Sequence, residues 1–239
     1  MNPYADLHWD CEKPQTRIKL CEFENLDSAY EASFLGCEFL GFHLFSDQDI
    51  PVKTAKFEEI FEELPPYVEK TLLTDLEIGK LLPILKRLKP EAVQYYDDTP
   101  TEHLEAIRDQ FPAIRILKVM SDKSEENDPS DDDAFLERYL PWCDAILLDS
   151  IRDGGSGKTG DWAHCAEIVK KSPKPVFLAG GLNPYNVKEA IQQVRPFGVD
   201  VENGVSNRIP SGIRLKNLQK CRLFIEAVRE ADWRLGRVL

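Results

Sequence analysis

The fold is decided by residues 175–205, which read PVFLAGGLNPYNVKEAIQQVRPFGVDVENGV. Short apolar runs at 176–179 and 198–201 flank a helical pattern at 184–194, and each run ends in a glycine-containing turn. A strand, a helix and a second strand in this order are typical of two parallel strands joined by a helical crossover.

The same alternation extends along the chain. It predicts eight strands, at 17–21, 39–44, 67–73, 92–96, 114–120, 145–149, 176–179 and 198–201. Helical patterns follow them at 26–35, 55–64, 76–88, 101–111, 133–140, 162–170, 184–194 and 215–230. Thr99-Pro100 and Asn183-Pro184 are expected to start two of the helices, with Thr or Asn as the cap and Pro in the first turn. The weakest strand pattern is the third, which Glu69 and Lys70 interrupt.

Eight strand-then-helix units in a chain of 239 residues favour an α/β fold, a single (β/α)8 or TIM barrel with parallel strands. We expect the barrel domain to span residues 17–239, after an N-terminal extension at 1–16. A doubly wound sheet is disfavoured because no G-x-G-x-x-G follows the first strand.

The charge of the chain limits its partners. The formal net charge is −12, which argues against nucleic-acid and membrane binding, since both favour a basic surface. It does not exclude an anionic substrate, because backbone N–H groups and helix N-termini can hold a phosphate. The acidic stretch SDKSEENDPSDDD at 121–133 is expected to form a solvated loop after the fifth strand.

The cysteines and the N-terminus indicate a cytoplasmic protein. Six cysteines are present without a C-x-x-C pair, so a zinc knuckle or a redox motif is not expected. Residues 1–14 are polar and lack the apolar segment of a signal peptide, and no apolar run reaches the roughly 18 residues of a membrane span. Free thiols in a reducing compartment are the simplest interpretation. The sequence does not distinguish a monomer from a homodimer.

Function in such a barrel lies on the loops that follow the strands. Asp149 ends the sixth predicted strand, in a position typical of a catalytic or ligand-orienting group, although capping a loop would also explain it. Three further segments could hold an anion, because their glycines expose backbone N–H groups. They contain Gly155, Gly157 and Lys158 after the sixth strand, Gly180 and Gly181 after the seventh, and Asn203 and Gly204 after the eighth.

The segments ILLDS (146–150), GGSGKTGDW (154–162) and residues 175–205 closely resemble phosphoribosylanthranilate isomerase, with AGGLNP and RPFGVDV as the most specific parts. Fainter likeness covers RIKLC at 17–21, the pattern Gly36…Gly41-Phe42 and AVQYY at 92–96. The resemblance implies an isomerase of tryptophan biosynthesis, which converts a phosphorylated aminoaldose to an aminoketose by an Amadori rearrangement, without a cofactor or a metal.

Carried over by motif, the resemblance implies that Cys21 is the general base and Asp149 the general acid. From the residues alone, Cys21 would be a buried small hydrophobe. The substrate phosphosugar would be held by the three glycine-containing segments, with Gln94 and Asp200, which stand in family motifs, completing the site.

Four departures leave the substrate open. The family's K-I-C-G is KLCE here, so Glu22 stands beside Cys21, where its charge is expected to raise the thiol pKa. The stretch after the second strand, LFSDQDIP at 44–51, lacks the arginine that grips the anthranilate carboxylate in the family. V-Q-L-H-G becomes VQYYD at 93–97, and D-V-S-S-G becomes DVENG at 200–204, which places Glu202 near the expected phosphate. Three hypotheses follow: a divergent phosphoribosylanthranilate isomerase, a paralogue for another phosphosugar with a neutral or cationic aglycone, or a barrel that binds without catalysis.

Overall fold

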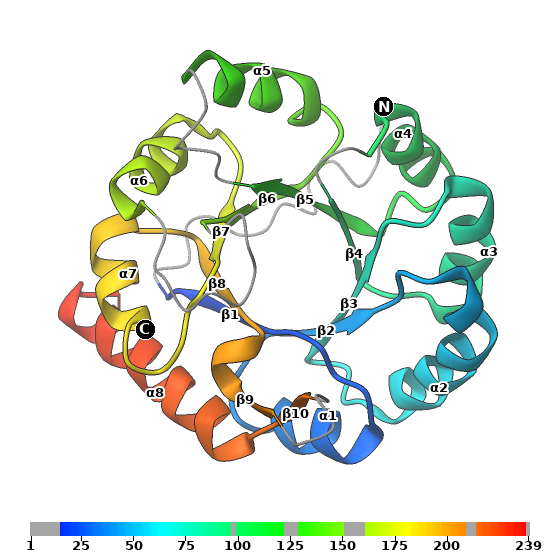
Figure 1. Cartoon of the computed structure of the whole chain (residues 1–239), viewed down its shortest axis with the longest axis horizontal. Helices are drawn as coiled ribbons and strands as arrows, with labels where there is room; N and C mark the ends of the chain where they lie inside the picture. Colours follow the sequence, from blue (N-terminus) through cyan, green and yellow to red (C-terminus); the bar gives the residue numbers. More distant parts are fainter. Residues whose placement is uncertain (1–14, 97–98, 122–128, 151–160, 209–213, 238–239) are drawn as a thin grey trace.

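Eight parallel strands close into a barrel in the computed structural model of the chain, and helices surround it (Figure 1). The structure describes residues 15–96, 99–121, 129–150, 161–208 and 214–237. β1 pairs with both β2 and β8, which completes the ring. The predicted (β/α)8 barrel is therefore confirmed. The strands are β1 (Arg17–Leu20), β2 (Phe39–His43), β3 (Glu69–Thr74), β4 (Ala92–Tyr95), β5 (Arg115–Ser121), β6 (Ala145–Asp149), β7 (Val176–Ala179) and β8 (Gly198–Val201).

One α-helix follows each strand. The helices are α1 (Leu26–Ser33), α2 (Ile50–Glu63), α3 (Ile78–Leu88), α4 (Thr101–Gln110), α5 (Pro129–Tyr139), α6 (Trp162–Lys171), α7 (Val187–Val194) and α8 (Leu218–Arg234). Among the described residues, none of the helices is long and apolar enough to cross a membrane. β1 begins at Arg17, and the predicted extension at 1–16 lies almost wholly outside the described residues.

Two apolar clusters stabilise the barrel. The smaller one fills the barrel interior with side chains from β2 and from β4 to β7, where Phe39 and Phe177 meet edge to face at 5.4 Å. Gly198 makes room for this packing, since a Cβ there would lie 2.4 Å from the Phe177 ring. The larger cluster lies between the strands and the helices. Each strand therefore has one face toward the barrel interior and one toward the helices, and both faces are covered by apolar side chains, as is usual for parallel strands.

The charged residues in β3 do not interrupt the strand, because each is paired with an oppositely charged side chain. Glu69 forms an ion pair with Arg115 of β5, and the Lys70 ammonium lies 2.9 Å from a Glu91 carboxylate oxygen. The strand is therefore regular from Glu69, where it pairs with Phe39 of β2.

Two helices begin earlier than predicted, and each has a proline in its first turn. α2 begins at Ile50 instead of residue 55, with Pro51 in its first turn. α5 begins at Pro129 instead of 133, and its first turn carries Asp131 and Asp132, which the helix dipole favours. The prediction of an acidic loop at 121–133 is therefore wrong at both ends, since Ser121 belongs to β5 and 129–133 to α5. Residues 122–128 lie outside the described residues.

Three other helices begin two or three residues later than predicted, namely α3 at Ile78, α7 at Val187 and α8 at Leu218. α4 begins at Thr101 as predicted, but without the predicted cap. The Thr99 hydroxyl donates to the Tyr96 carbonyl, so it does not cap α4, and Asn183 forms a turn that precedes α7 by three residues. α8 begins at Leu218 instead of 215, because residues before it form a hairpin of β9 (Ser206–Arg208) and β10 (Arg214–Lys216). The Asn217 side chain caps α8 by accepting from the Lys220 N–H.

A buried carboxylate on the last helix accepts hydrogen bonds from the residue that precedes the first strand. Asp232 of α8 is 2% exposed and accepts hydrogen bonds from the Thr16 N–H at 3.0 Å and the Thr16 hydroxyl at 2.6 Å. The Arg229 guanidinium lies 3.4 Å from the same carboxylate.

We predict that Asp232→Ala lowers the free energy of unfolding by about 3 kcal/mol, because it leaves the buried Thr16 N–H and hydroxyl without their acceptor and removes one of the acceptors of the Arg229 guanidinium. Urea denaturation measures this change. Glu226→Ala, on an exposed position of the same helix, is the matched control and should change stability by less than about 0.5 kcal/mol. Equal effects of the two variants would contradict this role of Asp232.

Candidate active site

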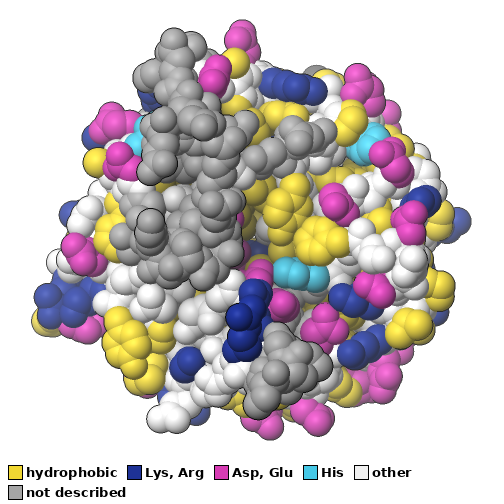
Figure 2. Space-filling view, viewed as in Figure 1, with side chains coloured by type: hydrophobic (Ala, Val, Ile, Leu, Met, Phe, Trp, Pro, Cys, Tyr) yellow, Lys and Arg dark blue, Asp and Glu magenta, His cyan; other side chains and the backbone are white. Residues whose placement is uncertain are grey.

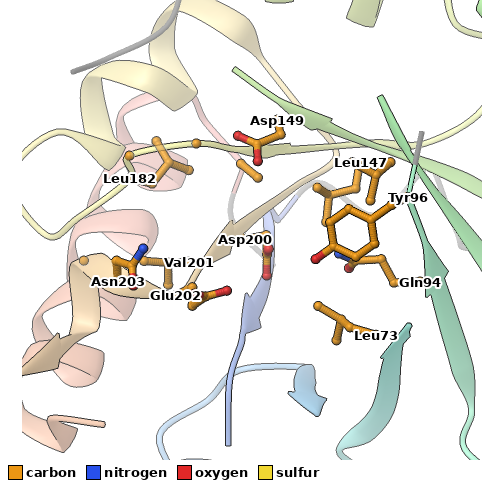
Figure 3. Close-up of a pocket in the computed structure, with 15 residues that line it drawn as sticks. Leu73, Gln94, Tyr96, Leu147, Asp149, Leu182, Asp200, Val201, Glu202 and Asn203 are labelled. Atoms are coloured by element: carbon orange, nitrogen blue, oxygen red, sulfur yellow. The ribbon is translucent and has the colours of Figure 1, made fainter. Parts of the chain in front are cut away.

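A cavity of about 150 Å³ opens at the C-terminal ends of the strands (Figure 3). Its walls include most of the predicted site residues, which are Gln94, Asp149, Gly180, Gly181, Asp200, Asn203 and Gly204. The side chains of Asp149, Asp200 and Tyr96 point toward the same space (Figure 3). Gly155, Gly157 and Lys158 lie outside the described residues. Sequence reasoning missed Tyr96 and Leu182 as wall residues, and it noted Glu202 only as a charge.

Cys21 lies beneath this cavity, between two charged groups. Its Sγ is 2.5 Å from the Lys19 Nζ and 3.1 Å from the Asp200 Oδ1, and the Lys19 Nζ is 3.0 Å from the same carboxylate oxygen. Lys19 and Cys21 share a face at the end of β1, because side chains alternate along a strand. The β1–β8 register places Lys19 directly opposite Asp200. Sequence reasoning missed Lys19, although it stands two residues before Cys21.

Burial sets the ionisation of this cluster, in which Lys19 is fully buried and Cys21 is 1% exposed. Burial, together with the charge of Asp200, raises the pKa of the Cys21 thiol well above its usual value, and Lys19 opposes this only in part. Burial also disfavours the charged form of Lys19, but Asp200 and Cys21 outweigh it and raise the pKa of the ammonium. At neutral pH the resting cluster therefore holds an ammonium and a thiol that donates to Asp200.

Gly41 of β2 provides the space that Cys21 occupies. A Cβ at this position would lie 2.5 Å from the Cys21 Sγ and 3.2 Å from its Cα. The glycine in the pattern noted from the sequence is therefore required by the close approach of β2 to the thiol.

The turns after β7 and β8 pack against each other. Gly180 has a φ of +92°, and a Cβ there would lie 2.7 Å from the Asp149 Oδ1. A Cβ at Gly204 would lie 2.0 Å from the Leu182 carbonyl oxygen, so only glycine permits this contact. The Asn186 side chain holds the first turn by donating to the Gly181 carbonyl at 3.0 Å. Two glycine turns are thus fixed side by side at the cavity wall, which is an arrangement suited to an anion.

Glu202 follows β8 directly, beside Asn203, and its side chain is directed toward β2. Its Oε1 accepts from Arg214 of β10 at 3.2 Å, and its Oε2 lies 3.5 Å from the His43 Nε2. Burial, reinforced by the charge of Glu22, raises the pKa of Glu202 to about 7, with Lys216 opposing. The carboxylate is thus directed at a cation and a histidine. This pairing reduces the repulsion that we expected between Glu202 and a bound phosphate.

Glu22 is not among the main causes of the raised Cys21 pKa. The carboxylates that raise the Cys21 pKa are Asp200 and Glu202, with burial as the largest cause. Glu22 has a φ of +67°, in the left-handed region that favours glycine, which accounts for the glycine in the family motif. Its Oε2 is buried without a hydrogen-bond partner among the described residues.

The acids after β2 face solvent. Asp47 and Asp49 lie in a short 3-10 helix, η1 (Asp47–Asp49), at exposed positions, and Asp47 forms an ion pair with Lys80 of α3. The acids that stand near the family's arginine position are therefore directed away from the cavity. Among the described residues, no group of three or more His, Cys, Asp or Glu side chains could hold a metal ion.

A buried thiol, two carboxylates and paired glycine turns at the C-terminal ends of the strands are typical of an enzyme of the (β/α)8-barrel class. A sequence model of N-(5'phosphoribosyl)anthranilate (PRA) isomerase matches residues 18–227. The chain belongs to this family.

Known members are similar along nearly the whole chain. N-(5'-phosphoribosyl)anthranilate isomerase of Methanocella arvoryzae is 34% identical over 221 residues, which cover 90% of this chain and 98% of that protein. The crystal structure of phosphoribosyl anthranilate isomerase from Thermotoga maritima is 30% identical, with a TM-score of 0.76 over 90% of this chain and all of that one. A structure in complex with reduced 1-(o-carboxyphenylamino)-1-deoxyribulose 5-phosphate is 28% identical, with a TM-score of 0.73 and the same coverage.

The contact between the two glycine turns generates a prediction. Gly204→Ala should lower the free energy of unfolding by about 2–3 kcal/mol, because the added methyl group meets the backbone of the neighbouring turn. Gly79→Ala, an exposed helical position with open space around it, is the control and should be neutral or stabilising by up to about 1 kcal/mol. Thermal unfolding compares the two, and a Gly204→Ala variant as stable as the control would refute the contact.

Proposed function

We propose that this chain is a phosphoribosylanthranilate isomerase, which converts an N-phosphoribosyl aryl amine to the corresponding 1-amino-1-deoxyribulose phosphate without a cofactor. The observation that carries the proposal is the Cys21 thiol held between Lys19 and Asp200 beneath a cavity that Asp149 also lines. An Amadori rearrangement needs an acid at the ring oxygen and a base at C2′.

Asp149 acts as the acid. It ends β6 at the cavity wall, beside Gly180, whose missing side chain leaves room for the carboxyl group. Protonation of the furanose oxygen breaks its bond to C1′ and leaves a C1′–nitrogen iminium ion. The proton stays on the released hydroxyl group.

Cys21 acts as the base, and Asp200 and Lys19 activate it. Because the resting thiol is protonated, its proton first moves to the Asp200 Oδ1 across the 3.1 Å contact. The thiolate then lies against the Lys19 ammonium, which compensates its charge. Removal of the C2′ proton by the thiolate gives an enol with a C1′–C2′ double bond. Proton return at C1′ and loss of the enol proton produce the ketone, so the reaction is balanced as an isomerisation.

The β7 and β8 turns hold the phosphate group. Gly180, Gly181, Asn203 and Gly204 present backbone at the cavity wall, where N–H groups can bind an anion without a lysine. Gln94 is 2% exposed, and its Oε1 has no hydrogen-bond partner among the described residues, so it can accept from a sugar hydroxyl. We include Gly155, Gly157 and Lys158 in the site on their sequence position alone.

A second assignment of the base is favoured by one observation. Asp200 lines the cavity, whereas Cys21 lies behind it. In this alternative, Asp200 takes the C2′ proton directly and Cys21 only supports its position. Retained turnover in a Cys21→Ala variant would select this alternative.

A monomer or homodimer, a cytoplasmic location, and the absence of nucleic-acid and membrane partners remain predictions. The negative charge and the free buried thiols of the described cysteines support them.

The other two hypotheses, a different phosphosugar and a barrel without catalysis, are tested by complementation. A tryptophan auxotroph that lacks the isomerase should grow when it expresses this chain, and failure with well-expressed folded protein would contradict the proposed function.

Direct assay of variants tests the roles of the two residues. We predict that Cys21→Ala and Asp149→Asn each lower kcat by about 10²- to 10⁴-fold, because each removes a proton-transfer group. Cys143→Ala, at another buried cysteine, should keep kcat within about 2-fold of wild type if its fold is intact. Conversion of the aminoaldose, followed by proton NMR, provides the rates. Near-normal turnover in both site variants would remove this mechanism.

A further inference from the structure

If the substrate carries an aryl carboxylate, this chain must bind it without the arginine that follows the second strand in the family. The residues in that stretch are acidic and exposed, and Asp47 is paired with Lys80. A carboxylate and an aromatic ring need a cation and an apolar wall within reach of the sugar. Both are present elsewhere at the cavity mouth.

The apolar wall consists of three rings in contact. Phe45 follows β2 and lies edge to face with His43 at 5.1 Å and with Tyr96 at 5.3 Å. Tyr96 also lines the cavity, so the wall is continuous with the proposed sugar site. Figure 2 shows large hydrophobic side chains beside a histidine near the centre of this face, with Lys or Arg and acidic side chains adjoining.

Cations gather at the end of this wall. The pKa of His43 is lowered to about 3, first by burial and then by Lys19, Lys53, Lys216 and Arg214, so the ring is neutral at physiological pH. The opposing carboxylates in this region are Glu22, Glu24 and Glu202. The histidine therefore joins an aromatic surface to a group of positive charges.

The guanidinium of Arg214 is the cation best placed to exchange partners. The Lys216 Nζ is held by the Glu202 carbonyl and the Ser206 hydroxyl, both at 2.9 Å. The Lys53 Nζ is held by Glu24 at 3.1 Å and the His43 carbonyl at 3.2 Å. Within the described residues, Arg214 makes a single side-chain contact, from NH1 to Glu202, which leaves most of its five N–H donors for a ligand.

We propose that Arg214, on the β9–β10 hairpin, binds the carboxylate of the substrate's aryl amine, whose ring packs against Phe45 and Tyr96, and that Glu202 occupies the guanidinium until the substrate arrives. This inference rests on the proposed function. The cation thus comes from the segment after β8 instead of the segment after β2, and the planar guanidinium suits a carboxylate in two-point contact.

Glu202 controls the availability of the arginine. Its pKa of about 7, raised by burial and by Glu22, means that Glu202 is neutral below that pH and charged above it. The titratable and charged groups that interact with Glu202 are Glu22, Asp200, His43, Lys216, Arg214, Cys21 and Tyr96. The neutral form releases Arg214, so carboxylate binding weakens as the pH rises through 7.

A pair of ligands separates this contact from binding of the rest of the molecule. The first ligand is reduced 1-(o-carboxyphenylamino)-1-deoxyribulose 5-phosphate, and the second is the same compound without the carboxyl group. Calorimetric titration of the full chain at pH 6.5 should show that wild type prefers the carboxylated ligand by about 10- to 100-fold. Arg214→Gln should bring this preference to within about 3-fold, with little change for the ligand that lacks the carboxylate.

Two variants sharpen the test. Arg208→Gln removes the same charge from the paired position on β9, which is exposed, and should keep the preference. Glu202→Gln should increase the preference at pH 8 and make it independent of pH between 6 and 8, because the competing carboxylate is gone.

The outcomes distinguish the inference from the function. Four outcomes would overturn the role of Arg214. In two of them, the wild type shows no preference for the carboxylated ligand, or the preference persists in Arg214→Gln. In the other two, Arg214→Gln lowers the affinity for both ligands equally, or Arg208→Gln lowers the preference as much as Arg214→Gln does. Turnover of the aminoaldose by the same wild-type sample tests the proposed function separately. If the wild type turns over the aminoaldose but Arg214→Gln keeps the preference, only the role of Arg214 is refuted. If the wild type is inactive but its preference depends on Arg214, only the proposed isomerase function is refuted.

Discussion

The register at which β1 joins β8 controls the rest of the site. Closing the barrel places Lys19 opposite Asp200, and the alternation of side chains along β1 brings Cys21 to the same face. Three ionisable groups thereby meet in a buried space, where each is tolerated only because the others compensate its charge and hydrogen bonds. The turn after β8 is aligned with the turn after β7 by a second register, in which Phe177 pairs with Gly198. The two registers of β8 therefore produce the proton-transfer cluster on one side and the proposed phosphate site on the other.

The two sides of the cavity differ in how they use charge. The β7 and β8 turns offer backbone, and Gly204 must be glycine because a side chain would meet the Leu182 carbonyl. The side toward β2 uses paired side chains, with Glu202 between Arg214 and His43. Backbone geometry tolerates little variation, whereas a cation can be supplied from any loop that reaches the ligand. This contrast explains why the glycine turns resemble the family closely while the stretch after β2 does not.

Much of this arrangement could be predicted from the sequence. Apolar runs alternating with helical patterns give the barrel, and residues that end strands, such as Asp149, fall at the cavity because parallel strands end at one rim. Helix starts were less predictable, since Pro129 begins a helix within an acidic stretch that also resembles a loop. The role of Arg214 could not be foreseen, because it depends on a three-residue hairpin strand that has no periodic signal. Lys19 was missed because a buried lysine is explained only by its partner 181 positions away.

Cys21 and Asp200 act as one proton-transfer unit in this mechanism. A double-mutant cycle on kcat measures their coupling, with Cys21→Ala, Asp200→Asn and the double variant assayed on the same substrate. If the two groups transfer one proton together, removing the second group costs little once the first is gone, so kcat of the double variant should be within about 3-fold of that of the slower single variant. If the losses of the two single variants instead multiply in the double variant, the thiol and the carboxylate work independently and do not form such a unit.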